Sequence, residues 1–391
     1  MPKRINLVTG AMGFSGSYTV RDLLRRGETV IGTDRAVLLN DGDHHKVLRS
    51  IGLDIDDPKV TWIASDLLDP PSLNALFEEP VTHVFHTASL YDYSASYETL
   101  HRVNVEGTRN LLEATLWRAT RLERFVHWST CGVFGKPYTA ASGKKVNLPF
   151  EEASSSPKNT PPGAKGPVGT KLVNDYSVSK WVQEKMLWEA YRDRGLPLIV
   201  VRPAPIYGPG SAYGHGGIIL AIAQGLVPAI PADSRRYITT SVHVADIAGF
   251  AIFAADHEEF IGEDFNVVDN SIVSYHEFLN YIGLLTGRTI RDLPLITTKS
   301  LAPVMSGAAH AWTYLQRRFG VPRVRVFEIQ SAEYVSSSYW LSNRKTLEVG
   351  YEYQYPDVRE GLKDTVAWLR RQGWLTDRRR LLVTGAATGK S

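Results

Sequence analysis

Tyr176 and Lys180, four residues apart, are the side chains best suited to do chemistry, because a helix would place both on one face. A free phenol titrates near ~10 and is a weak base at neutral pH. Lowering its pKa by ~2–3 units requires roughly 3–4 kcal/mol, which the Lys180 ammonium and an oxidised nicotinamide ring together could supply. The phenolate could then take the proton of an alcohol that loses a hydride. The spacing alone is also common on solvated helix surfaces.

Two hydroxyls at the end of a predicted strand give this pair its context. Ser129 and Thr130 follow the apolar run Phe125–Trp128, and the predicted helix bearing Tyr176 comes next. Doubly wound sheets bind ligands at the carboxyl ends of their strands. A hydroxyl, a phenol and an ammonium would converge there, with Thr130 holding the substrate oxygen by a hydrogen bond.

A glycine-rich turn follows the first predicted strand and opens a helix. Gly10, Gly13 and Gly16 have the spacing Gly-x-x-Gly-x-x-Gly. Such glycines make a tight turn, admit a pyrophosphate and let the helix pack closely, while the helix N-terminus attracts the phosphates. The alternative is an ordinary strand-to-helix turn, but its place at the first strand of an alternating pattern favours a dinucleotide site.

Acidic and small residues after the next strands complete the predicted cofactor site. Asp34 lies eighteen residues beyond Gly16, where a carboxylate can accept both ribose hydroxyls of NAD. Arg35 could instead hold a 2′-phosphate, so NAD is favoured and NADP remains open. Asp66 could bond the adenine amine, and Ala88 and Ser89 could flank the cofactor.

The elements that must position these residues alternate between strand and helix patterns. Predicted strands are Ile5–Thr9, Glu28–Thr33, Val60–Ala64, His83–Thr87, Phe125–Trp128 and Leu198–Arg202. Predicted helical segments are Ser15–Arg26, Ser72–Phe77, Glu98–Arg118 and Tyr176–Arg194, followed later by Ser241–Ala255 (a strand and helix), Tyr275–Leu285, Leu301–Phe319 and Arg359–Gln372. This order predicts an α/β fold with a doubly wound parallel sheet.

Irregular stretches divide the chain into two predicted lobes. We expect a dinucleotide-binding Rossmann domain from residues 1–205 and 241–270, and a smaller, interrupted substrate lobe from 206–240 and 271–375. The Pro-, Gly- and Ser-rich segment 136–172 is expected to be a flexible insertion, either a lid or a tolerated loop. In the substrate lobe, Trp312, Tyr314, Phe319, Tyr339 and Trp340 could line an apolar pocket or form a second core.

Composition excludes several classes of protein. The 44 basic and 41 acidic residues nearly cancel, with one short basic run at Arg378–Arg380, which argues against a nucleic-acid binder. The single cysteine, Cys131, excludes a disulfide framework and a multi-thiolate metal site. No apolar run reaches the ~18 residues of a membrane helix, and the early glycine turn leaves no room for a signal peptide, so a cytoplasmic protein is expected.

Histidines do not indicate a metal site. His83 and His86 are three apart on a predicted strand and would point to opposite faces, so we interpret His86 as structural. His44 and His45 lie in a predicted polar loop with acidic neighbours, a cluster more often solvated than metal-binding.

These motifs together resemble the extended short-chain dehydrogenase/reductase superfamily, and within it the 3β-hydroxysteroid dehydrogenase and sterol-4-carboxylate 3-dehydrogenase branch. The resemblance covers Ile5–Leu375. Its carriers are Thr9–Gly16, Val84–Ser89, Val103–Thr108, Trp128–Gly135, Tyr176–Lys180, Val201–Pro203, Ile206–Pro209, Val242–Ala248, Phe265–Val267, Tyr339–Ser342 and Leu347–Tyr351. The predicted insertion 136–172 is longer than most relatives carry, which bears on substrate access.

The resemblance implies roles for individual residues. Catalysis falls to Thr130, preferred over Ser129, with Tyr176 and Lys180. The cofactor would contact Gly10, Gly13, Phe14, Ser15, Gly16, Asp34, Arg35, Asp66, Leu67, Ala88, Ser89, Asn104, Tyr176, Lys180 and Pro203. An apolar, steroid- or sterol-like small molecule would contact Tyr91, Thr130, Cys131 and Tyr207, with NAD favoured as cofactor, NADP not excluded, and no metal. A homodimer through the segments Glu98–Arg118 and Tyr176–Arg194 is implied by resemblance only.

Alternatives of other kinds remain. A nucleotide-sugar epimerase would use the same trio and needs cations for a diphosphate, for which Arg235 and Arg236 are candidates. A sugar dehydratase fits less well, because Thr130-Cys131-Gly132 offers no acid after the hydroxyl. A non-catalytic dinucleotide sensor or scaffold could dispense with the tyrosine and lysine, and both are present.

The last residues carry a repeated motif. Leu382–Ala386 repeats Leu7–Ala11 and is followed by Gly389, Lys390 and Ser391. Our hypothesis is that 376–391 begins a truncated second nucleotide-binding domain of a longer tandem protein; chance similarity is the alternative.

Overall fold

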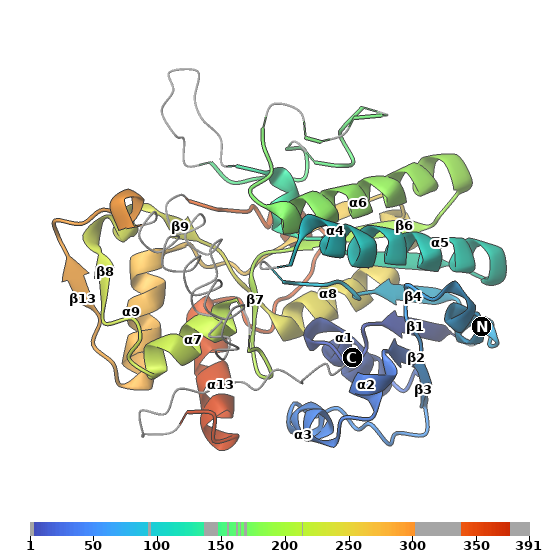
Figure 1. The fold of residues 1–391 in the computed structure, drawn as a ribbon, viewed down its shortest axis with the longest axis horizontal. Coiled ribbons are helices and arrows are strands. Elements are labelled where there is room, and N and C mark those ends of the chain that lie inside the picture. The colour runs from blue at the N-terminus through green and yellow to red at the C-terminus, as the bar shows by residue number, and fades with distance from the viewer. Residues whose placement is uncertain are drawn as a thin grey trace.

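A parallel sheet forms the centre of the computed structural model, which describes residues 4–92, 95–136, 148–301 and 338–375, except 155, 162, 165, 168, 169 and 213. Within these residues seven strands follow the order β11-β6-β5-β4-β1-β2-β3, and each neighbouring pair is parallel (Figure 1). The strands are β1 (Ile5–Thr9), β2 (Thr29–Asp34), β3 (Val60–Ala64), β4 (His83–His86), β5 (Arg124–Trp128), β6 (Leu198–Pro203) and β11 (Asp264–Val267). The strand order reverses between β1 and β4, where such folds bind ligands. The predicted doubly wound α/β fold is confirmed.

Helices cover both faces of this sheet (Figure 1). On one face lie α5 (Gly107–Arg118) and α6 (Asp175–Arg194), and on the other α1 (Phe14–Arg25) and α8 (Val244–Ala255). Successive strand residues alternate between the two resulting cores: Leu198 and Val200 pack toward α5 and α6, while Ile199 and Val201 pack toward α1 and α8. Strands buried on both faces read as continuous apolar runs, which is why the sequence identified them.

Other elements of the Rossmann part differ from the prediction. The residues expected to form a polar loop around His44 form the helix α3 (Gly42–Ser50), because the Asp41 side chain accepts hydrogen bonds from the first amides of that helix. The predicted helix Glu98–Arg118 is divided into α4 (Tyr97–Leu100), a π-helical turn (His101–Glu106) and α5. Shorter elements are α2 (Ala36–Leu39) and the 3-10 helices Pro70–Phe77, Cys131–Phe134 and Glu258–Phe260.

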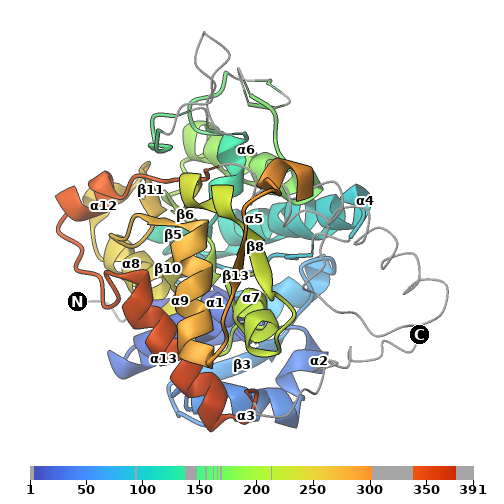
Figure 2. The ribbon, with the colours of Figure 1, turned by 90° about the vertical axis from the view of Figure 1, so that its left-hand side faces the viewer.

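The smaller lobe is assembled from separate stretches of the chain (Figure 2). Its elements are β7 (Ile206–Tyr207), α7 (His215–Ala223), β8 (Ala229–Pro231), a 3-10 helix (Ala232–Arg236), β9 (Ile238–Thr239), β12 (Val273–Ser274), α9 (Tyr275–Thr286), β13 (Arg291–Leu293), α12 (Arg344–Glu348) and α13 (Val358–Arg371), and β7 pairs with β10 (Val242–His243), which belongs to the segment predicted for the Rossmann domain. Two-stranded pairs β7–β10, β9–β12 and β8–β13 join these stretches, and α13 packs beside α9. The predicted helix Leu301–Phe319 lies, beyond its first residue, outside the described residues, as do Trp312, Tyr314, Phe319 and 376–391.

The described end of the predicted insertion packs against the sheet. Phe150 forms a bridge to Leu341 and stacks on Phe134 with ring centroids 5.2 Å apart. The Lys185 ammonium of α6 donates to the carbonyls of Thr160 and Pro161 at 2.9 and 3.0 Å. This part of the segment is therefore anchored to the elements that carry the site. In the described part of the chain, no helix is long and apolar enough to cross a membrane.

Buried histidines make the stability of this fold depend on pH. Burial lowers the pKa of His83, His86 and His243 to about 3, that of His215 to about 4, and that of His127 well below its ordinary value. Burial acts oppositely on acids, raising the pKa of Asp246 to about 6 and of Asp269 to about 7. On unfolding, the histidines regain ordinary pKa values near ~6.5 and take up protons, while the two carboxyls release theirs.

We therefore predict that the free energy of unfolding falls as the pH falls below about 6.5. Near pH ~5 the unfolded chain should hold about three more protons than the folded chain, which corresponds to about 4 kcal/mol per pH unit. Urea unfolding at several pH values measures this slope, and His127→Leu should reduce it by about one proton. A free energy of unfolding that is the same at about pH 7 and about pH 5 would contradict the prediction.

Candidate active site

The glycine turn has the shape that a dinucleotide pyrophosphate requires. Gly10 has φ +66°, and a Cβ there would lie 2.8 Å from the Cα of Ala88. A Cβ on Gly16 would collide with the carbonyl oxygen of Gly10. Gly13 is the N-cap of α1 and offers no side-chain acceptor to the amides of the first turn, which include those of Phe14 and Ser15. These amides and the positive end of the helix dipole fit a phosphate.

Asp34 ends β2 beside this turn, as predicted. Its carboxylate accepts the Met12 amide at 3.1 Å and the Arg35 amide at 2.9 Å, and partial burial raises the pKa of Asp34. The His44 ring in turn contacts the Met12 carbonyl oxygen at 2.6 Å. The Arg35 side chain is exposed. Asp34 therefore both shapes the turn and presents a carboxylate beside it, as an NAD ribose would need.

Further residues assigned to the cofactor lie at the ends of β3, β4 and β6. Asp66 is exposed and accepts the Leu68 amide at 2.9 Å, and the Leu67 carbonyl accepts from Asn110 at 2.8 Å. Pro203 is buried at the end of β6, paired with β11. Ala88 packs against Gly10. They follow the carboxyl edge of the sheet.

Asn104 ties the loop after β4 to α6. Its buried side-chain oxygen accepts from the Leu90 amide at 2.7 Å and the Ser89 hydroxyl at 3.1 Å, and its amide donates to the Ser179 hydroxyl at 3.0 Å. Ser179 directly precedes Lys180. Asn104 thus links the predicted nicotinamide end of the site to the helix of the tyrosine and lysine.

The structure places Thr130 just after the end of β5, and Tyr176 and Lys180 in the first two turns of α6. Tyr176 lies in the first turn of α6, and Tyr91 packs edge-on against it with ring centroids 5.1 Å apart. The Lys180 ammonium donates to the Trp128 carbonyl at the end of β5 at 2.8 Å. Thr130 caps the 3-10 helix that follows β5, its hydroxyl accepting the Gly132 amide at 3.2 Å. The helix and strand that carry the trio are therefore joined directly.

Lys180 is fully buried, and burial lowers its pKa to about 7, with the Glu184 carboxylate acting in the opposite direction. In the sequence analysis we expected Lys180 to act as an ammonium. At neutral pH the charge on Lys180 instead depends on its neighbours.

A buried ion-pair cluster beneath the trio was missed by the sequence analysis. The Arg202 guanidinium of β6 bonds Glu184 of α6 through Nη2 at 2.6 Å and Nε at 3.1 Å, and meets Asp264 of β11 at 2.5 Å. All three side chains are almost completely buried. A lone arginine in the apolar run Leu198–Ile206 was the available signal, since a buried guanidinium requires a carboxylate partner.

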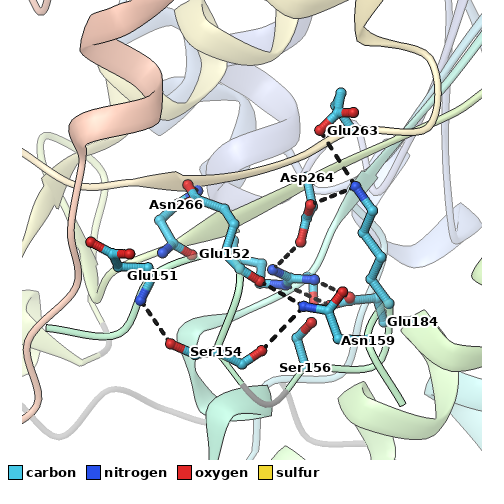
Figure 3. A network of polar contacts seen from close by, with 12 residues as sticks. Glu151, Glu152, Ser154, Ser156, Asn159, Glu184, Glu263, Asp264 and Asn266 are labelled. Atoms are coloured by element: carbon cyan, nitrogen blue, oxygen red, sulfur yellow. Dashed lines mark hydrogen bonds and ion pairs between the residues drawn. The ribbon is translucent and has the colours of Figure 1, made fainter. Parts of the chain in front are cut away.

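The cluster extends outward to segment 148–161 (Figure 3). The Lys158 ammonium lies 3.0 Å from Oδ1 of Asp264, the carboxylate oxygen that Arg202 does not contact, and 3.4 Å from the Glu263 carboxylate. The neighbouring Glu152 accepts the Asn266 amide at 2.7 Å. Lys345, from the other side, contacts Glu263 at 2.6 Å. The anchored segment is thus connected to the buried charges under the site.

The residues assigned to the substrate do not all gather at the trio. Tyr91, with 40% of its surface exposed, does. Cys131 is buried, burial raises the pKa of its thiol to about 12, and its carbonyl accepts from the Tyr339 hydroxyl at 2.6 Å, so we interpret it as a packing residue. Tyr207 is fully buried, its hydroxyl donates to the Val358 carbonyl at 3.3 Å, and its ring packs against α13. The structure therefore places Tyr207 in the core that joins the two lobes.

Other side chains singled out in the sequence analysis have hydrogen-bond or ion-pair partners within the protein. The two ring nitrogens of His86 contact the hydroxyls of Thr9 and Thr108 at 2.8 and 2.7 Å, consistent with a structural role. Arg235, a possible diphosphate ligand, contacts Asp292 at 2.6 Å. No cluster of histidine, cysteine and acidic residues that could hold a metal occurs among the residues that the structure describes.

Comparisons with known proteins agree with this fold. The model of the NAD dependent epimerase/dehydratase family matches residues 6–267. The chain is 30% identical to human 3 beta-hydroxysteroid dehydrogenase type 7, over 75% of this chain and 76% of that protein. It is 28% identical to sterol demethylase protein B of Methylococcus capsulatus, over 94% and 99% respectively. The fold is similar to that of UDP-glucose 4-epimerase from Thermus thermophilus in complex with NAD, with a TM-score of 0.64, 22% identity, and coverage of 94% of this chain and 99% of that chain.

Proposed function

The chain belongs to the NAD-dependent epimerase/dehydratase family, and from this premise we propose that it transfers a hydride between NAD(P) and the 3β-hydroxyl of a steroid or sterol. The observation that carries the proposal is the bond from Lys180 to the end of β5, which joins the helix bearing Tyr176 to the strand that leads to Thr130. A scaffold that only binds a dinucleotide would not need this arrangement.

Each residue of the site then has a defined task. NAD(P), when bound, supplies a nicotinamide ring that accepts or gives a hydride. The amides of the glycine turn would hold the pyrophosphate, and Asp34 the ribose hydroxyls. Thr130 would orient the substrate oxygen, and Tyr176 would take its proton as the hydride leaves the carbinol carbon. A charged Lys180 would stabilise the Tyr176 phenolate.

The names of the two relatives support a sterol-like substrate. If the sterol carries a carboxylate at carbon 4, oxidation of the 3-hydroxyl produces a β-keto acid. This product breaks its bond to the carboxylate carbon, releases carbon dioxide and leaves an enol, which requires no further catalytic residue. We propose this decarboxylating reaction as a variant of the same activity.

The rival function is a nucleotide-sugar epimerase, which would use the same trio. Its substrate diphosphate needs cationic ligands, and one of the two candidates, Arg235, is already paired with Asp292. This observation favours a sterol over a nucleotide sugar as the substrate.

A substrate panel tests the proposal. The enzyme is mixed with NAD or NADP and with 3β-hydroxysteroids, 4-carboxysterols or UDP-sugars, and the absorbance of the reduced cofactor is followed. We expect net reduction of the cofactor with the steroid or sterol substrates. Turnover confined to UDP-sugars would show that the substrate assignment is wrong.

Asp34 should determine the choice between the two cofactors, and we propose NAD as the preferred one. Asp34→Ser removes the carboxylate that would accept the ribose hydroxyls and repel a 2′-phosphate. We expect NAD binding to weaken by roughly 10–100-fold and NADP binding to weaken less or improve. Fluorescence titration with the two reduced cofactors measures this, with Asp54→Ser, an exposed aspartate before β3, as the control for net charge. Equal weakening for both cofactors would argue against the assignment.

A further inference from the structure

Helix α6 is fastened to the end of β5 by two side chains at one-turn spacing. Tyr176, Lys180 and Glu184 follow one another at intervals of four residues, so they lie along one face of the helix. Lys180 donates to the Trp128 carbonyl at 2.8 Å, and Glu184 accepts from the hydroxyl of Ser129 at 2.5 Å. The last residue of β5 and the residue that follows it are thus bonded to two consecutive turns of the helix.

Glu184 is held rigidly in this position. Besides Ser129, its carboxylate accepts hydrogen bonds from the Trp188 indole at 2.9 Å and from two nitrogens of Arg202. The bidentate geometry of Arg202 fixes the plane of the carboxylate. A fully buried carboxylate with four donors has no freedom to turn away, so the Ser129 hydroxyl has one partner at one place.

The direction of Thr130 follows from that of Ser129. Along an extended strand, successive side chains point to opposite faces. Phe125 and Val126 already alternate between the two cores, and the Ser129 side chain points toward α6, where it meets Glu184. The backbone of Thr130 is extended as well, with φ −158° and ψ 152°, so its side chain leaves the backbone on the side opposite to that of Ser129. Fixing Ser129 therefore fixes the side on which the Thr130 side chain leaves the backbone, and the bond from the Gly132 amide holds its hydroxyl there.

We propose that Glu184 is a positioning residue for this site: fixed by Arg202, it holds Ser129 and so directs Thr130, and its negative charge stabilises the Lys180 ammonium one turn away. The inference rests on the proposed function, because it assumes that Thr130 and Lys180 act on the substrate and on Tyr176. Glu184 itself touches neither substrate nor cofactor in this scheme.

The charged groups around Lys180 support the second part of the proposal, that Glu184 stabilises the Lys180 ammonium. Besides Tyr176, which precedes Lys180 by one turn on α6, His127 on β5 and His86 on β4 interact with it, and burial keeps both histidines neutral by lowering the pKa of each. Glu184 is the group that raises the pKa of Lys180 against the effect of burial. Without this carboxylate, Lys180 would lose its charge at a lower pH and stabilise the Tyr176 phenolate less.

Two matched serine variants test the positioning. Ser129→Ala removes the hydroxyl bonded to Glu184, whereas Ser177→Ala removes an equally buried hydroxyl that has no hydrogen-bond partner among the described residues. We expect Ser129→Ala to lower kcat by roughly 10–100-fold with KM and the cofactor Kd unchanged, because small misplacements of reacting groups have effects of this size. Ser177→Ala should turn over like the parent enzyme. Equal kcat values for Ser129→Ala and the parent, or equal losses in both variants, would overturn the inference.

A second measurement needs no substrate and separates this inference from the proposed function. In the cofactor-free protein with isotope-labelled lysine, NMR titration of Lys180 should show a lower pKa in Glu184→Gln than in the parent, and an unchanged pKa in Glu189→Gln, on the exposed side of α6. An unchanged Lys180 pKa in Glu184→Gln would overturn the inference. Failure of the parent enzyme in the substrate panel would overturn the proposed function, and the titration would still decide on Glu184. If Glu184→Gln does not fold, the serine pair decides.

Discussion

Replacing Tyr176 with phenylalanine should remove turnover while leaving cofactor binding nearly intact. The substitution deletes one hydroxyl and keeps the ring that packs against Tyr91. In the proposed reaction this hydroxyl is the group that exchanges a proton with the substrate oxygen, and such general bases contribute about 10²–10⁴-fold to the rate. We therefore expect kcat to fall by a factor in this range, whereas the Kd of the reduced cofactor should change little.

Steady-state kinetics and cofactor fluorescence measure these two quantities on the same protein. Tyr97→Phe makes the same chemical change on α4, which packs against α6, and should retain parental kinetics. If Tyr176→Phe still turned over at the parental rate, Tyr176 would not be the base. Weakened cofactor binding in this variant, with kcat unchanged, would instead indicate a binding role.

The second large effect is expected at Arg202, and it concerns stability. Arg202→Met leaves the buried carboxylate of Glu184 without its cation and removes one of the two cations, Arg202 and Lys158, that contact Asp264. Breaking a buried ion pair by removing one partner typically costs about 3–5 kcal/mol, because the remaining charge is uncompensated. We expect a loss of this size in the free energy of unfolding.

Urea unfolding of Arg202→Met and Arg235→Met compares the buried pair with an exposed one. Arg235 forms its ion pair with Asp292 at the surface, where such pairs contribute about 0–1 kcal/mol. A loss in Arg202→Met no larger than that in Arg235→Met would show that the buried cluster does not stabilise the fold.

Local patterns in the sequence were sufficient for the main features of the sheet and the site. The bounds of β1 and β3 agree with prediction, because short runs rich in apolar and β-branched residues with polar flanks predict strands. The turn at Gly10 and the helix that carries Tyr176 and Lys180 were found by residue type and spacing. In each case neighbouring residues contain the whole signal.

Features that depend on contacts between distant segments were not predicted. Glu184 and Arg202 are both visible in the sequence, but only the folded sheet and helix show that they meet. Tyr207 follows β6 in a family motif, yet the packing of α13 places it in the core between the lobes. The helix at His44 was missed because its strongest signal, the Asp41 cap, was interpreted as part of a polar loop.

The central claim, net hydride transfer from a sterol alcohol, is tested most directly with a 3β-hydroxysteroid that carries deuterium on the carbinol carbon. The enzyme is incubated with this substrate and the oxidised cofactor, and the released reduced cofactor is examined by mass spectrometry. Our account predicts that the released cofactor carries the deuterium and that the substrate has become a ketone. Released reduced cofactor without deuterium, or an unoxidised substrate, would contradict it.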